Sequence, residues 1–377
     1  MYGFRKSLIG FFNHYRKIPQ SRLLEIEVFR GIAVLCIILH HYFGLYHLLH
    51  GHHFSTPDPA TLAIIFNWGV YGVHLFFIIS GFVIFISLDK NIRPIDFIVG
   101  RIARLYPAYW IVVIYTFTIR SLFHFYSLPF TWSDVIINLS MFQQILGFRN
   151  IDGPFWYLAY ELMFYIFMIT LFSLRMLNSV KTLVSGVLIY QLFMLILLQF
   201  LGVNVGLTEG FAAGFTVATL HVRQILIISL LPFFHLFMIG ILFYRLRLAK
   251  DKSFMSHVLI GCCVLMEFIV WGIGATLALC LFVSMFYLFV YNRSSFIINK
   301  PLLFLGRISY CLFLIHQATG FIIIKQCYGH KINPFFGIGI AISVSIVLAT
   351  LLNFFIEEPA RAWVKRFYLQ NSSSDTA

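Results

Sequence analysis

The chain has 377 residues, of which 60% are hydrophobic and only 11% are charged, and its mean hydropathy is +0.89. Too few polar side chains remain to cover a soluble domain, so the composition excludes one and predicts a multi-pass α-helical membrane protein. The net charge of +13 does not indicate nucleic-acid binding, because the basic residues lie in short segments between apolar runs.

Apolar runs along the chain predict ten membrane-spanning helices. We expect them at residues 30–49, 65–88, 104–124, 155–174, 181–201, 223–244, 255–271, 273–291, 302–325 and 337–356. An even number of spans places both termini on one side of the membrane. All but five of the 27 Lys and Arg residues fall on that side, so the positive-inside rule predicts that both termini are cytoplasmic.

Three parts are expected from this pattern: a cytoplasmic N-terminal segment at 1–29, a ten-span membrane domain at 30–362 and a cytoplasmic tail at 363–377. The N-terminal segment lacks the pattern of a cleaved signal peptide, so we expect the first span to act as the targeting anchor. The six cysteines lie within or near apolar segments, which favours packing over a disulfide framework or a metal site. Because the outward loops are short, any chemistry has to take place in the membrane domain.

The first predicted span begins at Arg30 and contains His41, eleven residues later. That spacing is about three helical turns, so both side chains share one face, roughly 16 Å apart along the axis. His41 would then reach about the middle of a ~30 Å hydrocarbon core, where an ionisable group is costly unless it faces protein or water. His41 is therefore a functional candidate, although a hydrogen bond to a neighbouring helix explains it equally well. Glu27 lies one turn before the arginine.

A group of polar residues inside an apolar run is called a polar island here, and Arg30 with His41 is the first. The second and third spans carry two more polar islands. His74 and Ser80 lie in the second span, in a glycine-containing stretch that would also suit close helix packing. Arg101 and Arg104 come shortly before Tyr106 at the start of the third span. Three residues apart on a helix, the two guanidinium groups share one face, where they could bind phosphates or anchor the helix at the membrane surface.

Two further islands lie in the fourth and ninth spans. The fourth contains Trp156 and Glu161, and Glu161 lies roughly 10 Å from the outer end, at a depth similar to that of His41. A buried carboxylate near an imidazole can fix its tautomer and raise its basicity. His316 lies in the ninth span, and the acidic pair Glu357-Glu358 follows the last span.

In order and spacing, these islands resemble the acyltransferase type 3 family of integral membrane acyltransferases. The resemblance extends from about residue 22 to 362 and rests on Arg30 with His41 and on the stretches 72–82, 97–107, 156–165, 305–316 and 357–359. It implies transfer of an acyl group, commonly acetyl, from cytoplasmic acyl-coenzyme A onto the hydroxyl of a sugar or similar acceptor, often on the outer face.

The sequence departs from the family pattern at two of these islands. His74 stands where an acidic residue is usual, and Tyr157, Ala159 and Tyr160 replace serines and a valine near Glu161. Whether His74 takes over the role of the missing acid is open at this point.

The resemblance, carried over by position, assigns a role to each candidate residue. His41 is expected to be the general base, oriented by Glu161 or Glu27. Donor phosphates are expected at the cytoplasmic mouth, at Arg30, Arg101, Arg104 and Tyr106. Acceptor contacts are expected from Trp156, His74, His316 and Ser80. The expected function is therefore membrane O-acylation of a cell-surface glycan or its lipid-linked precursor, in the bacterial cytoplasmic membrane, with acyl-coenzyme A as donor and neither a metal nor nucleic acid as partner.

Two other functions stay open on the sequence. A transporter could use His41, His74, Glu161 and Glu267 to relay protons or to bind a polar substrate, and an assembly subunit could use the same residues only to join helices. The sequence has no internal repeat that would support a transporter, and a transporter does not need the basic residues expected to bind the donor at the cytoplasmic end. The sequence gives neither the acyl chain, the acceptor sugar and its hydroxyl, nor the number of subunits in a homo-oligomer.

Overall fold

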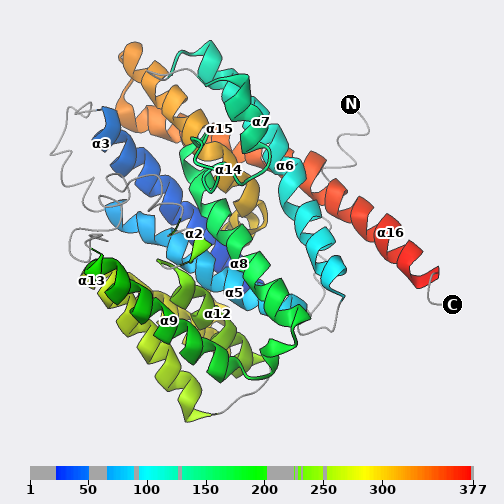
Figure 1. The fold of residues 1–377 in the computed structure, drawn as a ribbon. Helices are drawn as coiled ribbons and strands as arrows, with labels where there is room; N and C mark the ends of the chain where they lie inside the picture. The colour runs from blue at the N-terminus through cyan, green and yellow to red at the C-terminus, as the bar shows by residue number, and fades with distance from the viewer. Residues whose placement is uncertain are drawn as a thin grey trace.

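The computed structural model describes residues 23–50, 66–88, 93–125, 130–201, 225, 228–230, 232–248 and 253–374. In these segments the regular secondary structure is helical throughout, without a strand (Figure 1). The protein is an all-α integral membrane protein, as the composition predicts. Most of the expected N-terminal segment at 1–29 lies outside the described residues.

The described residues form helices and short helical turns. In chain order they are α2 (Leu24–Leu39), the π-helical turn η1 (His40–Leu45), α3 (Tyr46–His50), η2 (Trp68–Tyr71), α5 (Gly72–Leu88), α6 (Pro94–Leu122), α7 (Trp132–Asn138), η3 (Gly153–Phe155), α8 (Trp156–Ser173), η4 (Met176–Asn178), α9 (Val180–Phe200), α12 (Phe234–Arg247), α13 (Phe254–Val290), η5 (Ser295–Ile297), α14 (Lys300–Gly329), α15 (Pro334–Leu352), the π-helical turn η6 (Asn353–Glu357) and α16 (Glu358–Ser374).

Eight stretches of the described chain are long and apolar enough to cross a membrane. They are Leu24–His50, Trp68–Leu88, Pro94–Leu122, Gly153–Ser173, Val180–Phe200, Phe254–Val290, Lys300–Gly329 and Pro334–Val364. The span expected at 223–244 falls partly outside the described residues, and its described helix, α12, has 14 residues. The difference from ten spans therefore comes from this segment and from α13, which covers two expected spans.

The two spans expected at 255–271 and 273–291 form a hairpin within α13. Gly272 interrupts the helix with φ 79° and ψ −171°, a backbone conformation that glycine adopts without the steric cost of a Cβ atom. Nδ1 of His257 lies 2.8 Å from the hydroxyl of Tyr287, thirty residues further along the chain. Because these residues lie at nearly equal distances on either side of Gly272, the two arms run antiparallel.

Helix α14 forms the centre of the bundle, and 89% of the residues in its most hydrophobic 18-residue stretch are buried. It packs against α2, α6 and α15, whereas α9, α12 and α13 gather on the other side of α5 (Figure 1). Glycines allow the closest of these contacts. A methyl group on Gly31 of α2 would overlap the carbonyl oxygen of Leu302, and one on Gly306 of α14 would overlap that of Glu27.

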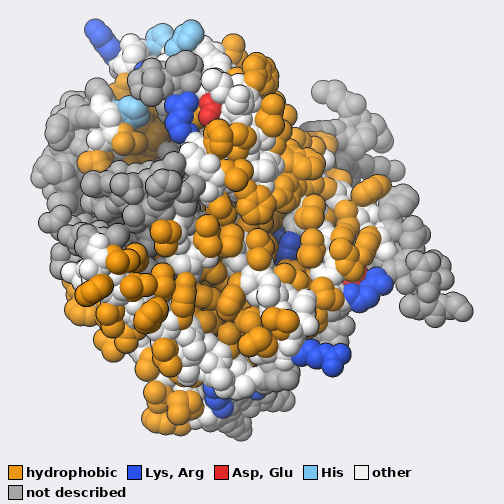
Figure 2. All heavy atoms as spheres, in the orientation of Figure 1, with side chains coloured by type: hydrophobic (Ala, Val, Ile, Leu, Met, Phe, Trp, Pro, Cys, Tyr) orange, Lys and Arg blue, Asp and Glu red, His pale blue; other side chains and the backbone are white. Residues whose placement is uncertain are grey.

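The outer surface of the bundle is apolar over a broad band, and Lys and Arg side chains lie mainly near the edges of the face shown in Figure 2. On α9 the side chains of Ile189 and Phe200 are 70% and 85% exposed. Water would make such exposure unfavourable, whereas a lipid environment makes it neutral or favourable. The buried polar groups are therefore the ones that need a functional or packing explanation.

Candidate active site

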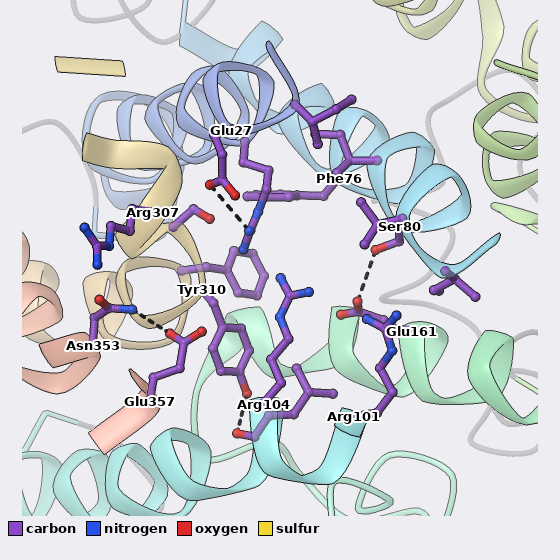
Figure 3. A pocket seen from close by; sticks show the side chains of 18 of the residues that line it. Glu27, Phe76, Ser80, Arg101, Arg104, Glu161, Arg307, Tyr310, Asn353 and Glu357 are labelled. Atoms are coloured by element: carbon purple, nitrogen blue, oxygen red, sulfur yellow. Dashed lines mark hydrogen bonds and ion pairs between the residues drawn. The ribbon is translucent and has the colours of Figure 1, made fainter. Parts of the chain in front are cut away.

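A charged pocket of about 440 Å³ lies between α2, α5, α6, α8, α14 and the turn from η6 into α16. Its charged lining residues are five arginines and four glutamates: Arg30, Arg101, Arg104, Arg307, Arg361, Glu27, Glu161, Glu357 and Glu358. In Figure 3, Arg101 and Arg104 extend from α6 towards the centre of the pocket, while Glu27 and Glu357 approach from other sides. Five of these segments, all except α5, thus bring their charges together inside the bundle.

The three arginines expected at the donor site share this pocket but differ in their contacts. Nη2 of Arg101 donates to the Ser87 hydroxyl at 2.8 Å, and its guanidinium group lies over the Tyr165 ring at 5.2 Å. Arg30 faces Glu27 at 3.7 Å, which is an ion pair beyond hydrogen-bonding distance. The buried Nε of Arg104 has no hydrogen-bond partner among the described residues. The pocket therefore holds positive charge with donor groups left over.

The C-terminal side of the pocket contains charges to which the sequence gave no role in binding. Arg307 bonds to Glu358 at 2.6 Å. Glu357 accepts hydrogen bonds from Asn353 at 3.0 Å and from the Cys311 thiol at 3.2 Å, and Arg361 lies 3.8 Å from it. In the sequence, Arg307, Glu357 and Glu358 belong to the family-like stretches 305–316 and 357–359, which gave them no role in ligand binding. The basic residues of this region are explained by the positive-inside rule without any ligand.

His41 lies in the π-helical turn η1, beyond the inner end of the pocket, and its partner is His316 of α14. Nδ1 of His41 is 2.5 Å from Nε2 of His316. On its other side, Nδ1 of His316 lies 2.9 Å from the carbonyl oxygen of Phe313 and 3.1 Å from that of Leu312. His316 is fully buried and His41 is partly exposed. The structure thus joins the first and the ninth predicted spans through two imidazoles.

The expected pairing of His41 with Glu161 or Glu27 is wrong. The Glu161 carboxylate accepts hydrogen bonds from Ser80 at 3.1 Å and from Tyr165 at 2.5 Å, and it lines the arginine pocket together with Glu27. Similar depth suggested the pairing, but depth gives only a position along the membrane normal. It does not say which neighbour a helix face meets, and this face of α8 meets α5 and α6.

A layer of aromatic side chains separates the pocket from the histidine pair. Phe76, Tyr157 and Phe313 line the inner end of the pocket. The Phe313 ring lies 5.9 Å from Phe76, 5.2 Å from Tyr157 and 6.1 Å from His316, measured between ring centroids. The aromatic layer therefore lies between the arginine pocket and His316, and His316 in turn contacts His41.

Two of the expected site residues lie away from both features. The Tyr106 hydroxyl donates to the carbonyl oxygen of Ser140 at 3.0 Å, and the ring lines a separate apolar groove with Trp110 and Trp363, so its expected place in the donor site is wrong. Trp156 stacks on Phe233 with 5.6 Å between centroids. Both positions were assigned from neighbours in sequence, and successive residues on a helix face different directions.

His74, the residue that departs from the family pattern, belongs to a second buried cluster. Its Nδ1 lies 2.6 Å from one oxygen of Glu267, and Nε2 of His235 lies 2.6 Å from the other. Gln191 bonds to the remaining nitrogen of His235 at 3.1 Å. This cluster joins α5, α9, α12 and α13. Neither here nor elsewhere in the described part of the chain do three His, Cys, Asp or Glu side chains form a metal-binding group.

Comparison with known proteins agrees with this architecture. A family model described as an acyltransferase domain matches residues 23–354. The exopolysaccharide production protein ExoZ of Rhizobium meliloti (strain 1021) is 36% identical over 62 residues, a match that covers 16% of this chain and 16% of that protein. No solved structure matches. Since the family match includes every described helix from α2 to α15, the chain belongs to the acyltransferase type 3 family and is a membrane acyltransferase.

Proposed function

We propose that the protein is an O-acyltransferase that moves an acyl group, first of all acetyl, from acyl-coenzyme A to a hydroxyl of a cell-surface glycan or its lipid-linked precursor. His41 is the general base. The observation that carries this proposal is the arginine-lined pocket, whose lining residue Phe313 contacts His316, the hydrogen-bond partner of His41. A function of another class, such as transport, has no comparable support, because a transporter needs no cluster of guanidinium groups.

The arginine pocket suits the phosphates of the donor. Guanidinium groups bind phosphate oxygens through charge-assisted hydrogen bonds. Arg104 has a buried Nε without a partner among the described residues, and Arg30 lies too far from Glu27 for a hydrogen bond. Both therefore have donor groups available for a ligand. In this arrangement Glu27 and Glu161 balance the positive charge of the empty pocket rather than assist the base.

The acyl end of the donor has to pass the aromatic layer to reach His41. We propose that the side chains of Phe76, Tyr157 and Phe313 turn aside when the donor's arm is bound. His41 then takes the proton of the acceptor hydroxyl as its oxygen attacks the thioester carbonyl carbon. The carbon–sulfur bond breaks, and the imidazolium returns the proton to the departing thiolate, so that no proton is gained or lost overall.

The acceptor approaches from the side opposite the arginine pocket. With both termini in the cytoplasm, as the charge pattern predicts, the pocket opens towards the cytoplasm, where acyl-coenzyme A is made. The acceptor then lies on the outer side of the bacterial cytoplasmic membrane. The relative ExoZ is named as an exopolysaccharide production protein, which supports a glycan as acceptor.

The test uses the full chain in lipid nanodiscs with radiolabelled acetyl-coenzyme A. The proposal predicts saturable binding of the donor and slow release of free coenzyme A, accelerated by a lipid-linked glycan acceptor that becomes labelled. Arg104→Gln should weaken donor binding, and His41→Ala should leave binding intact while abolishing transfer. Binding of acetyl-coenzyme A that does not respond to Arg104→Gln would refute the donor site, and labelled acceptor formed by His41→Ala at a rate near that of the wild type would refute the base.

A further inference from the structure

The hydrogen bonds of His316 fix which of its nitrogens carries hydrogen. Nδ1 faces the carbonyl oxygens of Phe313 and Leu312, which only accept hydrogen bonds, so Nδ1 carries hydrogen. The ring is fully buried, and no carboxylate among the described residues hydrogen-bonds to it. A second proton would place an uncompensated charge there, which is unfavourable. His316 is therefore neutral, and its Nε2 is a hydrogen-bond acceptor.

His41 must then be the donor in the bond between the two rings. The ring planes differ by only 7°, and the centroids are 4.8 Å apart while the two nitrogens are 2.5 Å apart. This geometry joins the rings edge to edge, as an in-plane N–H···N bond requires. Since Nε2 of His316 accepts, Nδ1 of His41 carries hydrogen, and Nε2 of neutral His41 keeps its lone pair. No partner for that nitrogen is found among the described residues.

The surrounding contacts keep His316 in place. The Tyr42 hydroxyl donates to the carbonyl oxygen of His316 at 2.7 Å and bonds to Ser345 of α15 at 2.9 Å. Two residues further along α14, the backbone N–H of Ala318 donates to Asp152 at 3.2 Å, and Asp152 is itself paired with Arg120 at 2.7 Å. Three separate elements thus fix the helix turn that carries His316, so its ring forms a rigid support for His41.

We propose that His316 is a positioning residue that holds His41 in the Nδ1–H tautomer, so that Nε2 is the catalytic base, and that it does not bind the acceptor. The inference rests on the proposed function, because it assumes that His41 removes the acceptor's proton. The opposite tautomer would direct a hydrogen at the hydroxyl and could not take up its proton. His316 thus acts on the reaction through His41 alone.

The first test measures the tautomer directly. The protein is labelled with ¹⁵N-histidine in nanodiscs, His41 is assigned by comparison with His41→Ala, and two-bond ¹H–¹⁵N correlations identify the protonated nitrogen. The wild type should show Nδ1–H on His41. His316→Leu, which removes the acceptor, should shift His41 towards Nε2–H, while His316→Gln, whose amide oxygen can still accept, should preserve Nδ1–H at least in part. Nε2–H on His41 in the wild type would overturn the inference.

The second test separates positioning from substrate binding by kinetics. His316→Leu should lower kcat roughly 10²-fold with the KM values of both substrates unchanged, as misplacement of a catalytic group does. His316→Gln should recover part of that loss, and His330→Leu, at the exposed end of the same helix, should leave kcat unchanged. A rise in the acceptor's KM alone would make His316 a binding residue instead.

The two tests also distinguish this inference from the proposed function. If His41→Ala transfers acyl groups at a rate near that of the wild type, the base assignment fails whatever the spectrum shows. If transfer depends on His41 but the wild-type ring carries its hydrogen on Nε2, only the role of His316 fails. Should His316→Leu not fold, the wild-type spectrum and His316→Gln still decide the matter.

Discussion

Two pairs of histidines lie inside the bundle, and they differ in what their imidazoles bond to. His74 and His235 share the two oxygens of Glu267, and Gln191 bonds to the second nitrogen of His235. His41, by contrast, bonds through one nitrogen to another imidazole and has no carboxylate partner among the described residues. A carboxylate that accepts from two rings is a closed network that joins helices. A ring held by one nitrogen keeps the other for chemistry.

The difference shows why burial and charge alone do not identify a catalytic residue. Glu267 and His235 are fully buried and do not line the arginine pocket, and the hydrogen bonds of their cluster connect α9, α12 and α13 to α5. His41 is partly exposed, and its partner His316 contacts Phe313, which lines that pocket. Ionisable residues inside a membrane are functional candidates by default, and the unshared hydrogen-bonding capacity separates the two cases here.

Removing the base should give the largest effect. His41→Ala should lower kcat by roughly two to four orders of magnitude, the usual contribution of a general base. Because His41 is partly exposed and bonded to one partner only, the melting temperature should change little. Initial rates with radiolabelled acetyl-coenzyme A and a thermal melt of the same preparation check both statements. His40→Phe is the control, because His40 points about 100° away around the helix; a dead His40→Phe beside an active His41→Ala would reverse the comparison.

A substitution in the cluster around Glu267 should have the opposite effect: it should lower stability and leave turnover unchanged. In Glu267→Gln an amide nitrogen replaces one carboxylate oxygen, and it cannot accept from an imidazole N–H. One ring must change tautomer or lose its bond, and Nδ1 of His235 is already committed to Gln191. The free energy of unfolding should fall by about 1–3 kcal/mol, with kcat of the folded protein unchanged.

A melting curve and an activity assay on the same sample test this prediction. Glu25→Gln is the matched control, since it makes the same chemical change at a residue outside both clusters and outside the pocket. If Glu267→Gln were stable and inactive, this cluster would belong to the catalytic machinery and the comparison would fail.

The arginine pocket should respond through donor binding. Arg104→Gln removes one charged hydrogen-bond donor, worth about 1.5–3 kcal/mol to an anion, so the KM for acetyl-coenzyme A should rise about 10- to 100-fold. The acceptor's KM and kcat should remain near those of the wild type. Arg293→Gln removes the same charge from an exposed position outside the pocket and should have no effect. An equal rise in both KM values would instead indicate a general loss of structure.

The sequence predicts the fold well because lipid imposes a simple requirement. Runs of about 20 apolar residues must be helical to satisfy their backbone groups, so the helix positions follow from hydropathy. The break at Gly272 was also anticipated as the boundary between two spans, because a glycine between two apolar runs permits the turn. Residues 223, 224, 226, 227 and 231 lie outside the described residues, so the start of the span expected at 223–244 stays a prediction.

The site was predicted less completely, because the sequence does not show how each helix is rotated about its own axis. Spacing placed Arg30 below His41 on one helix, and three arginines expected together do meet in one pocket. Spacing does not, however, tell which face of α8 or α14 meets which neighbour. Glu161 was therefore paired with His41, although α8 turns it towards Ser80, and the bond between His41 and His316 was not foreseen.

The smallest effect is expected from Glu161→Gln, the change that separates the two interpretations of this carboxylate. As a partner of His41 it would be needed for turnover, whereas in the structure it lines the arginine pocket and bonds to Ser80 and Tyr165. Glutamine keeps the oxygen that accepts these bonds and removes a negative charge from a site proposed to bind phosphates. The KM for acetyl-coenzyme A should therefore fall slightly, by about two- to fivefold, because one unfavourable charge interaction is lost in a partly screened pocket, and kcat should stay close to that of the wild type.

Steady-state kinetics with varied donor concentration measure both constants for this variant. Glu357→Gln is the matched control, since Glu357 lines the same pocket on its other side and its oxygen accepts from Asn353 and Cys311. The two variants should change the donor KM in the same direction, because each removes one negative charge from one pocket. A hundredfold loss of kcat in Glu161→Gln alone, with the KM unchanged, would show that Glu161 acts on the base after all. For Glu161 to reach the base, the aromatic layer between the pocket and the histidine pair would have to rearrange during the reaction, while the pairing of the two histidines stays in place.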